Sequence, residues 1–419
     1  LIKEKLESRF KIMEIIVQKY GGTSVGSIAK IKKIALNIKK LKNKKTAPVI
    51  IVSAMAGETN KLIKLVNSIS SLPNEREYDQ IISTGEKVSS SLLVMALNEI
   101  NVKALSLDAS KANILTDNIH SKASIVSIGT KEIKKYLSKG FVVVIPGFQG
   151  INSNNDITTL GRGGSDLSAV AIAGALKAER CELLKDDVDG IYTTDPKLYR
   201  KAKKINYISY QEMLEMSSLG SKVLQSKAVE MANQLNTKIH VKSTFDNKKK
   251  GTIVMSEKKI PLREKKVVSG ITHDLKQAKI SIIGIKDTPG IASKIFKPIS
   301  ESGIIVDMIV QNISTEGETD LTFTISKEDL NKTFKILREN KSKLSYYKLI
   351  KDEKIALISI VGAGMKTHTG IATRMFTSLA KSKINISMIS TSEIKISCVI
   401  NNNSCKKAIS SLHKEFGLG

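Results

Sequence analysis

A glycine-rich run from Thr158 to Asp166, Thr-Thr-Leu-Gly-Arg-Gly-Gly-Ser-Asp, has the residue types of a ligand-binding loop. It joins a strand-like stretch at 141–145 to an apolar helical stretch at 167–176. Glycines let backbone N–H groups approach a ligand, and an arginine can bind a carboxylate through two parallel hydrogen bonds. A flexible loop would require neither the arginine nor the glycines beside a strand end. The run therefore predicts a ligand crevice in which Arg162 binds a carboxylate and Asp166 orients the reacting groups or a metal ion.

A second pair of glycines, Gly21 and Gly22, follows the strand-like Ile15–Val17 and precedes a helical pattern. Backbone amides at a glycine turn and at a helix N-terminus attract phosphate, and Lys19 at the strand end could meet a transferred phosphoryl group. A plain glycine turn with a surface lysine explains the same residues almost as well. The run is not a Walker loop, because no Gly-Lys-Ser/Thr follows it.

Three polar side chains stand where other strand-like or helical stretches begin or end. Ser53 and Thr59 flank the turn after the apolar run at 48–54, where small hydroxyl groups suit a small polar substrate. Glu86 precedes the apolar helical stretch at 88–97 and could hold an ammonium group. Helix capping is the favoured explanation for Thr59 alone, and the helix macrodipole explains Glu86 equally well.

An acidic run, Asp186-Asp187-Val188-Asp189-Gly190, follows a short apolar stretch at 181–184. Closely spaced carboxylates can bind the ribose of a nucleotide or Mg²⁺, and Tyr192 offers a flat face to a base. Lys222, at a helix start, could reach the phosphates of ATP. An acidic turn without a ligand is the alternative.

Composition limits the class of protein. The chain has 419 residues, enough for two or three domains, and 67 Lys and Arg against 40 Asp and Glu give a formal net charge of +27. Compositional drift is the favoured explanation of this charge, because the basic runs lack the interleaved aromatic residues of nucleic-acid binders. No apolar run approaches the length of a membrane span, and the three cysteines show no metal-binding spacing. Buried or free thiols in a reducing cytosol are expected.

The order of apolar runs and helical patterns predicts an α/β fold. Continuous β-branched runs separated by helices indicate a mostly parallel sheet covered on both faces. The last third repeats a strand–helix–strand–strand–helix order, with the same Gly-Ile-Ala turn at 290–292 and 370–372, as in ferredoxin-like units. The predicted parts are an extension at 1–12, a catalytic domain at 13–255, a charged linker at 256–266, and two repeats at 267–345 and 346–419.

Taken together, these segments resemble the aspartate kinases over residues 14–416. The Lys-Tyr-Gly-Gly-Thr-Ser-Val-Gly run at 19–26, the run at 158–166 and Asp-Val-Asp-Gly-Ile-Tyr-Thr-Thr-Asp-Pro at 187–196 carry the resemblance in the family's order. It implies an amino-acid-kinase domain followed by two ACT domains. The implied reaction transfers phosphate from ATP with Mg²⁺ to the side-chain carboxylate of aspartate, the first step of lysine, threonine and methionine (and diaminopimelate) biosynthesis.

The resemblance also assigns residues to roles. The implied catalytic residues are Lys19 and Asp166, and the implied aspartate-binding residues are Ser53, Thr59, Glu86, Arg162 and Ser165. The implied ATP-binding residues are Gly21, Gly22, Thr23, Ser24, Gly163, Gly164, Asp186, Asp187, Tyr192, Lys197 and Lys222. A feedback effector, lysine or threonine, would bind at Asp287, Gly290, Ile291, Gln311 and Asn312. No protein ligand to a metal ion is predicted.

The chain departs from the family's usual pattern at a few positions. Asp186 replaces a threonine and Lys197 replaces an arginine, which changes fine contacts to ATP because lysine cannot copy a bidentate arginine contact. Gln225-Ser226 replaces a common His-Pro.

Three other functions compete with aspartate phosphorylation: an amino-acid sensor that has lost its activity, a nucleic-acid binder, and a related kinase acting on glutamate or carbamate. The expected protein is a cytoplasmic homodimer or higher oligomer, joined through its ACT units, that binds neither membrane nor nucleic acid.

Overall fold

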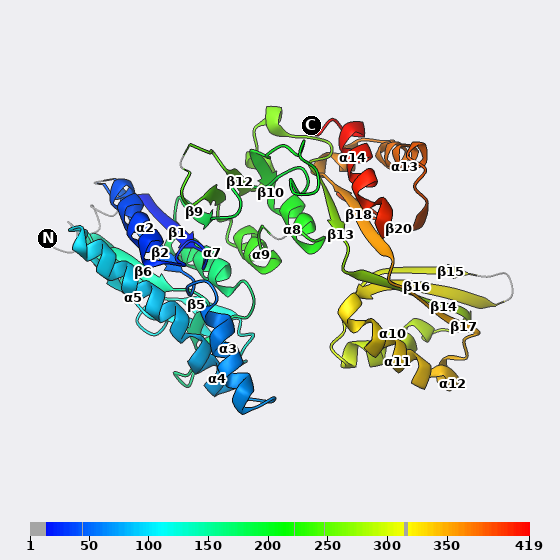
Figure 1. Cartoon of the computed structure of the whole chain (residues 1–419), viewed down its shortest axis with the longest axis horizontal. Coiled ribbons are helices and arrows are strands. Elements are labelled where there is room, and N and C mark those ends of the chain that lie inside the picture. Colours follow the sequence, from blue (N-terminus) through cyan, green and yellow to red (C-terminus); the bar gives the residue numbers. More distant parts are fainter. Residues whose placement is uncertain (1–13, 44, 222, 247, 314–316) are drawn as a thin grey trace. The chain divides into compact units, whose positions relative to one another are not determined.

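The computed structural model describes residues 14–43, 45–221, 223–246, 248–313 and 317–419 (Figure 1). The predicted extension at 1–12 and Lys222 lie outside these residues. The described chain forms two compact units. We call residues 14–191, 204–217 and 223–264 the N-terminal unit, and residues 192–203, 218–221 and 265–419 the C-terminal unit.

An eight-stranded sheet forms the centre of the N-terminal unit, in the order β10-β12-β11-β9-β1-β2-β6-β3. Every neighbouring pair is parallel except β11 with β12, which confirms the predicted mostly parallel sheet. Strand β2 is buried along its whole length, as its continuous apolar run predicts for a strand covered on both faces. The strands are β1 (Glu14–Tyr20), β2 (Thr46–Val52), β3 (Ala104–Ser106), β6 (Val142–Pro146), β9 (Arg180–Lys185), β10 (Tyr207–Ser209), β11 (Ile239–Ser243) and β12 (Thr252–Met255).

Helices cover both faces of this sheet. Tyr20 at the end of β1 packs with α2 (Ile28–Leu41) and α5 (Thr84–Glu99) in one buried cluster. Side chains alternate along a strand, so Lys19 points to the opposite face, where it meets α7 (Gly164–Leu176). Almost every residue of α7 is buried, which agrees with its apolar sequence after Ser168. The other helices are α3 (Glu58–Ile69), α4 (Glu75–Ile82), α6 (Lys131–Ser138), α8 (Tyr210–Ser218) and α9 (Ser226–Gln234).

A smaller four-stranded sheet in the same unit, in the order β5-β4-β7-β8, places the glycine-rich loop. Strand β8 ends at Thr159, and α7 begins at Gly164. The loop between them therefore has a fixed strand on one side and a buried helix on the other. The strands are β4 (Ile114–Thr116), β5 (Ile125–Ile128), β7 (Gln149–Ile151) and β8 (Ile157–Thr159).

The C-terminal unit contains two four-stranded antiparallel sheets, in the orders β15-β16-β14-β17 and β13-β18-β20-β19, which confirms the predicted ferredoxin-like repeats. Two strands are exchanged: β17 pairs with β14 of the first repeat, and β13 pairs with β18 of the second. The repeats are therefore interlocked. The strands are β13 (Gly270–Asp274), β14 (Gln277–Lys286), β15 (Val306–Ile313), β16 (Glu318–Ser326), β17 (Lys348–Asp352), β18 (Ile355–Val361), β19 (Ile386–Thr391) and β20 (Lys395–Asn401).

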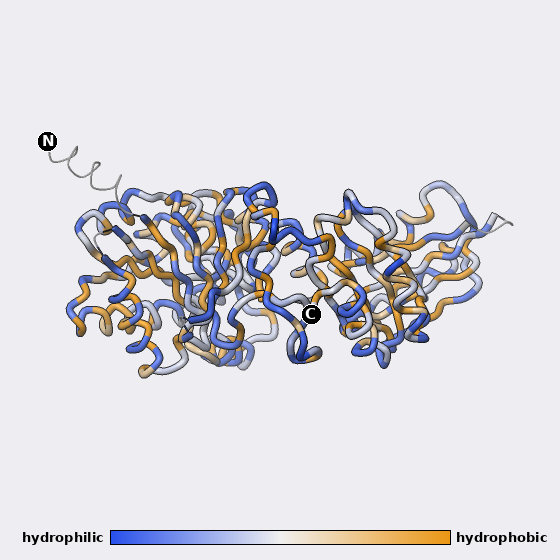
Figure 2. Tube along the Cα trace, turned by 90° about the horizontal axis from the view of Figure 1, so that it is seen from above, coloured by the Kyte–Doolittle hydropathy of each residue, from blue (hydrophilic) through white to orange (hydrophobic). Residues whose placement is uncertain are grey.

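The helices of each repeat pack against its own sheet. Each repeat opens its first helix at a glycine with positive φ, 88° at Gly290 and 80° at Gly370, where a side chain would strain the backbone. The helices are α10 (Ile291–Glu301), α11 (Leu330–Glu339), α12 (Lys341–Leu344), α13 (Ile371–Lys381) and α14 (Cys405–Glu415). Figure 2 shows hydrophobic and hydrophilic stretches alternating along the chain trace.

The three cysteines are free and buried, as expected. Among the described residues, no helix combines the length and the apolar character that a membrane crossing requires.

Candidate active site

A buried carboxylate shared by two lysines lies where β1, β9 and α7 meet. Asp166, in the first turn of α7, is only 4% exposed. Its Oδ1 is 2.7 Å from Lys19 Nζ, and its Oδ2 is 2.9 Å from Lys185 Nζ. Lys19 lies on β1 and Lys185 ends the neighbouring parallel strand β9. Two ammonium groups around one carboxylate leave a surplus positive charge in a buried place.

The pKa shifts follow from this geometry. Burial by itself would raise the pKa of the Asp166 carboxyl group, but the charges of Lys19 and Lys185 outweigh burial and hold this pKa well below its ordinary value. Burial lowers the pKa of Lys19 against the attraction of Asp166, and the like charge of Lys185 adds to the lowering. A second anion beside Lys19 and Lys185, such as a phosphate, would stabilise both ammonium groups.

A cavity of about 450 Å³ opens beside this carboxylate. Its walls come from the loops after β1, β2 and β8, the start of α5 and the end of β9. The loops after β1 and β2 follow the carboxyl ends of parallel strands, where open α/β sheets bind ligands, and the loop after β8 of the smaller sheet joins them. Of the residues singled out in the sequence, the cavity brings together Lys19, Gly22, Ser53, Thr59, Glu86, Arg162, Gly163, Gly164, Ser165 and Asp166.

Glu86 presents an unpaired carboxylate oxygen in this cavity wall. Its Oε1 accepts a hydrogen bond from the Ala54 N–H at 3.0 Å, whereas Oε2 is buried and has no hydrogen-bond partner among the described residues. Burial raises the pKa of the Glu86 carboxyl group to about 7, although the hydrogen bond from Ala54 opposes this rise. A buried oxygen without a partner is costly, so a cationic ligand here would be stabilised.

Two glycines of the cavity wall cannot carry a side chain. Gly163 has φ of +77°, and an added Cβ would lie 2.3 Å from Gln225 Cγ. An added Cβ on Gly22 would lie 2.8 Å from the Ala54 carbonyl oxygen. Both positions therefore need glycine because of their neighbours within the protein, and whether their backbone approaches a phosphate stays a prediction. Arg162 between the loop glycines is exposed and free to meet a ligand.

Several residues predicted to bind ATP lie outside this cavity. Ser24 is fully buried, and its hydroxyl group forms a 2.8 Å hydrogen bond with Thr244 Oγ1. Asp186 pairs with Lys30 at 2.6 Å, and Asp187 is exposed just after β9. The remaining predicted residues outside the cavity lining are Gly21, Thr23, Tyr192 and Lys197, of which the last two belong to the C-terminal unit.

Two residues that the sequence analysis did not single out support the site. Lys185 binds Asp166, and its only sequence signal is its position at a strand end. Asp79 on α4 is fully buried and accepts hydrogen bonds from the Thr159 N–H at 3.0 Å, the Thr159 hydroxyl at 2.5 Å and the Ser121 N–H at 2.9 Å. It therefore fixes the end of β8, directly before the glycine-rich loop.

Replacing Asp166 by asparagine tests the shared carboxylate. The variant leaves the buried ammonium group of Lys19 and the partly buried one of Lys185 without their counter-charge, so we expect the free energy of unfolding to fall by about 3 kcal/mol. We expect kcat to fall by a factor of about 100 or more, because both lysines lose their fixed positions. Urea unfolding and steady-state kinetics measure the two effects. Asp156→Asn is the matched control, because Asp156 pairs with Arg76 near the surface. Equal behaviour of both variants would contradict the assigned role.

Comparisons with known proteins agree with this architecture. The amino acid kinase family matches residues 14–243, and the ACT domain matches residues 280–340 and 358–416. The aspartokinase of Pseudomonas aeruginosa is 46% identical over 406 residues, covering 97% of this chain and 98% of that protein. The aspartokinase of Helicobacter pylori strain 26695 is 48% identical over 406 residues, covering 96% and 99%.

Solved structures share the fold. The aspartate kinase of Clostridium acetobutylicum has a TM-score of 0.80 at 25% identity, covering 96% of this chain and 100% of that one. Aspartokinase III of E. coli, at 24% identity, gives TM-scores of 0.76 in complex with aspartate and ADP and 0.77 with lysine and aspartate, covering 96% of this chain and 100% and 99% of those chains. The chain thus belongs to the aspartokinases of the amino acid kinase family, and it is an aspartate kinase with C-terminal ACT domains.

Proposed function

We propose that the chain transfers the γ-phosphoryl group of ATP, bound as its Mg²⁺ complex, to the side-chain carboxylate of L-aspartate. The observation that carries this proposal is the Lys19–Asp166–Lys185 cluster at the wall of the 450 Å³ cavity. In the reaction, a carboxylate oxygen of aspartate forms a bond to the γ-phosphorus while the bond from this phosphorus to the β-phosphate oxygen breaks. The products are 4-phospho-L-aspartate and ADP. The reaction would open the biosynthetic pathway to lysine, threonine, methionine and diaminopimelate in the cytoplasm.

Charge is the main obstacle to this reaction, because two anions must approach each other. Lys19 and Lys185, with the backbone N–H groups around Gly22 and Gly163, would offset the charge that moves through the phosphoryl group. Asp166 holds the two ammonium groups in place before the substrates arrive. An aspartate side chain, with an ordinary pKa of about 3.9, is already ionised at neutral pH. The reaction therefore needs no general base.

Substrate choice rests on two charged side chains of the cavity. Arg162 would bind the α-carboxylate of aspartate through two hydrogen bonds, which leaves the side-chain carboxylate free to react. The unpaired Oε2 of Glu86 would accept the α-ammonium group. The hydroxyl groups of Ser53, Thr59 and Ser165 line the same cavity and would complete the contacts.

An ADP-release assay with aspartate, glutamate and N-acetylglutamate tests the acceptor. We expect turnover with aspartate alone. Arg162→Lys should raise the KM for aspartate about tenfold or more, with the KM for ATP within about twofold, because lysine cannot form the bidentate contact. Arg76→Lys, a change in an exposed ion pair, is the control. Faster turnover with glutamate, or equal aspartate kinetics in wild type and Arg162→Lys, would refute this assignment.

The raised pKa of Glu86 predicts how aspartate binding depends on pH. Only ionised Glu86 attracts the ammonium group, so the KM for aspartate should fall as pH rises through about 7. Below that pH the KM for aspartate should increase as pH falls, approaching a change of about tenfold for each pH unit. The measurements are made at saturating ATP. Glu86→Gln should show a higher KM that stays nearly constant between about pH 6 and pH 8. A constant KM in the wild type would show that Glu86 does not bind the ammonium group.

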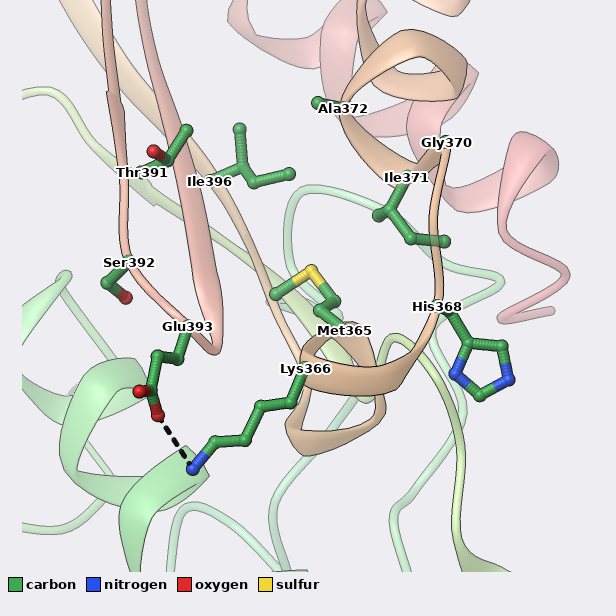
Figure 3. A pocket seen from close by; sticks show the side chains of 10 residues that line it. All are labelled: Met365, Lys366, His368, Gly370, Ile371, Ala372, Thr391, Ser392, Glu393 and Ile396. Atoms are coloured by element: carbon green, nitrogen blue, oxygen red, sulfur yellow. Dashed lines mark ion pairs between the residues drawn. The ribbon is translucent and has the colours of Figure 1, made fainter.

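We further propose feedback regulation by lysine, threonine or both. In each ACT repeat the effector would bind between the turn before the first helix and the end of the second strand, a place that we call the corner of the repeat. In the first repeat the corner residues are Asp287, Gly290, Ile291, Gln311 and Asn312. In the second repeat Gly370, Ile371, Thr391 and Ser392 hold the same places, and they line a cavity of about 500 Å³ (Figure 3). Lys366 and Glu393 form a 3.0 Å ion pair at this cavity. The pair offers both charges that an amino acid requires.

Exposed isoleucines support the proposal that the ACT units join two chains. Ile305 is 83% exposed, Ile309 on β15 is 51% exposed, and Ile389 on β19 is 43% exposed. β15 and β19 each form one of the two edges of their sheet. Exposed apolar side chains beside sheet edges are typical of a surface that a partner covers. A homodimer or higher oligomer is the assembly we propose.

Calorimetric titration with lysine and threonine, separately and together, tests the regulation. We expect at least one of them to bind. Glu393→Gln removes the negative charge of the Lys366–Glu393 pair, so it should weaken binding of the effector that occupies the second repeat about tenfold. Asp287→Asn is the matched change in the first repeat and assigns the effector to one corner or the other. The absence of heat with either amino acid would defeat the proposal.

A further inference from the structure

Asp79 joins three segments of the N-terminal unit that lie far apart in the sequence. It belongs to α4, its side chain is fully buried, and its Oδ2 accepts hydrogen bonds from the Ser121 N–H at 2.9 Å and the Thr159 N–H at 3.0 Å. His120 Nδ1 lies 2.9 Å from the same oxygen, and the Thr159 hydroxyl group donates to Oδ1 at 2.5 Å. One carboxylate therefore holds together α4, the segment at 120–123 and the end of β8.

The segment at 120–123 has a backbone conformation that needs support. Ser121 has φ of +64°, in the left-handed region that residues with a Cβ rarely adopt. Asp79 accepts the hydrogen bond of its N–H, and the Ala123 N–H donates to the Thr159 carbonyl oxygen at 2.9 Å. Unfavourable backbone conformations of this kind persist where the surrounding contacts determine them, and they gather at functional sites. Here the contacts tie the segment to Thr159, the last residue of β8.

The supported segment lies against the glycine-rich loop. An added Cβ on Gly161 would lie 3.2 Å from the Ser121 carbonyl oxygen, so the two backbones are in close contact at this point. Gly161 itself has φ of +72°, and Arg162 follows it directly. The backbone before Arg162 is therefore fixed by Thr159 on one side and Ser121 on the other, and Asp79 holds both.

Arg162 depends on this backbone for its position. Its side chain is exposed, and among the described residues its guanidinium group has no hydrogen-bond or ion-pair partner. Gly161 and Arg162 line the cavity beside Asp166, whereas Asp79 does not. Asp79 can therefore affect a ligand of the cavity only through the residues that it holds.

The other end of the loop is held by different contacts. Asp166 pairs with Lys19 and Lys185, and it lies in the first turn of the buried helix α7. None of these contacts involves Asp79. A change at Asp79 should therefore move the Arg162 end of the loop more than the charged cluster.

We propose that Asp79 is a positioning residue for Arg162, which acts through Thr159 and Ser121 to fix the backbone of the glycine-rich loop. It thereby sets the affinity for the carboxylate that Arg162 binds. The proposal rests on the proposed contact between Arg162 and the α-carboxylate of aspartate. It assigns to α4, which carries no reacting group, a task in binding the substrate.

Substitutions at Thr159 and Asp79 test the proposal in the full-length chain. Thr159→Val removes the hydroxyl donor and keeps the backbone N–H, so it should raise the KM for aspartate about fivefold, with kcat and the KM for ATP within about twofold. Thr159→Ser keeps the hydroxyl group and should stay close to the wild type. Asp79→Ala removes every contact of the carboxylate and should raise the KM for aspartate about tenfold or more. If Asp79→Ala does not fold, Thr159→Val decides alone.

The double variant Thr159→Val, Arg162→Lys separates a positioning role from a general loss of structure. Lysine has already lost the bidentate contact that depends on the position of the loop. Adding Thr159→Val to Arg162→Lys should therefore raise the KM for aspartate by less than about twofold. An equal factor with and without Arg162 would overturn the positioning role.

Tyr210→Phe is the matched control for a loss of stability. It also removes one buried hydroxyl group of the N-terminal unit, which donates to the Thr237 carbonyl oxygen at 2.8 Å, and neither residue lines the cavity. Its KM for aspartate should equal that of the wild type. An increase like that of Thr159→Val would show that lost stability, and not the position of the loop, sets this KM.

Hydrogen exchange of the backbone amides at 160–163 measures the order of the loop without the reaction. In Thr159→Val these amides should exchange about tenfold faster than in the wild type, and in Tyr210→Phe they should not change. Unchanged exchange in Thr159→Val would overturn the proposal. Failure of the wild-type chain to phosphorylate aspartate would instead refute the proposed function, and the exchange rates would still show whether Asp79 and Thr159 hold the loop.

Discussion

The candidate active site depends on one buried carboxylate, Asp166, which pairs with the ammonium groups of two lysines and leaves a surplus positive charge. Charges inside a protein are costly unless they are paired, so Lys19 and Lys185 can occupy the cavity wall only with Asp166 between them. The fold supplies this arrangement directly. Adjacent parallel strands β1 and β9 end at the same edge of the sheet and bring the two lysines together. Helix α7 begins opposite them, and its positive N-terminal end favours the carboxylate in its first turn. The surplus positive charge then lies at the cavity wall, where the proposed phosphoryl group would meet it.

The sequence predicted the strands and the loop of this site better than it predicted which side chains contact one another there. The apolar runs located the strands, and the glycines around Arg162 located the loop, because both signals lie within a few consecutive residues. The partnership of Lys185 with Asp166 depends on β9 lying beside β1, and no local pattern reveals strand order. Asp79 resembled an ordinary polar residue of an amphipathic helix, although it holds Thr159, 80 residues later in the chain. Long-range contacts of this kind are decided by tertiary packing.

The exchange of β13 and β17 illustrates the same limit in the C-terminal unit. The repeat was visible in the sequence because each copy contains the same order of strands, helices and glycine turn. Which extra strand completes which sheet was not visible, because either strand could add to an open sheet edge. The observed pairing completes each sheet with a strand that the sequence analysis had assigned to the other repeat. Backbone hydrogen bonds therefore join the two repeats to each other.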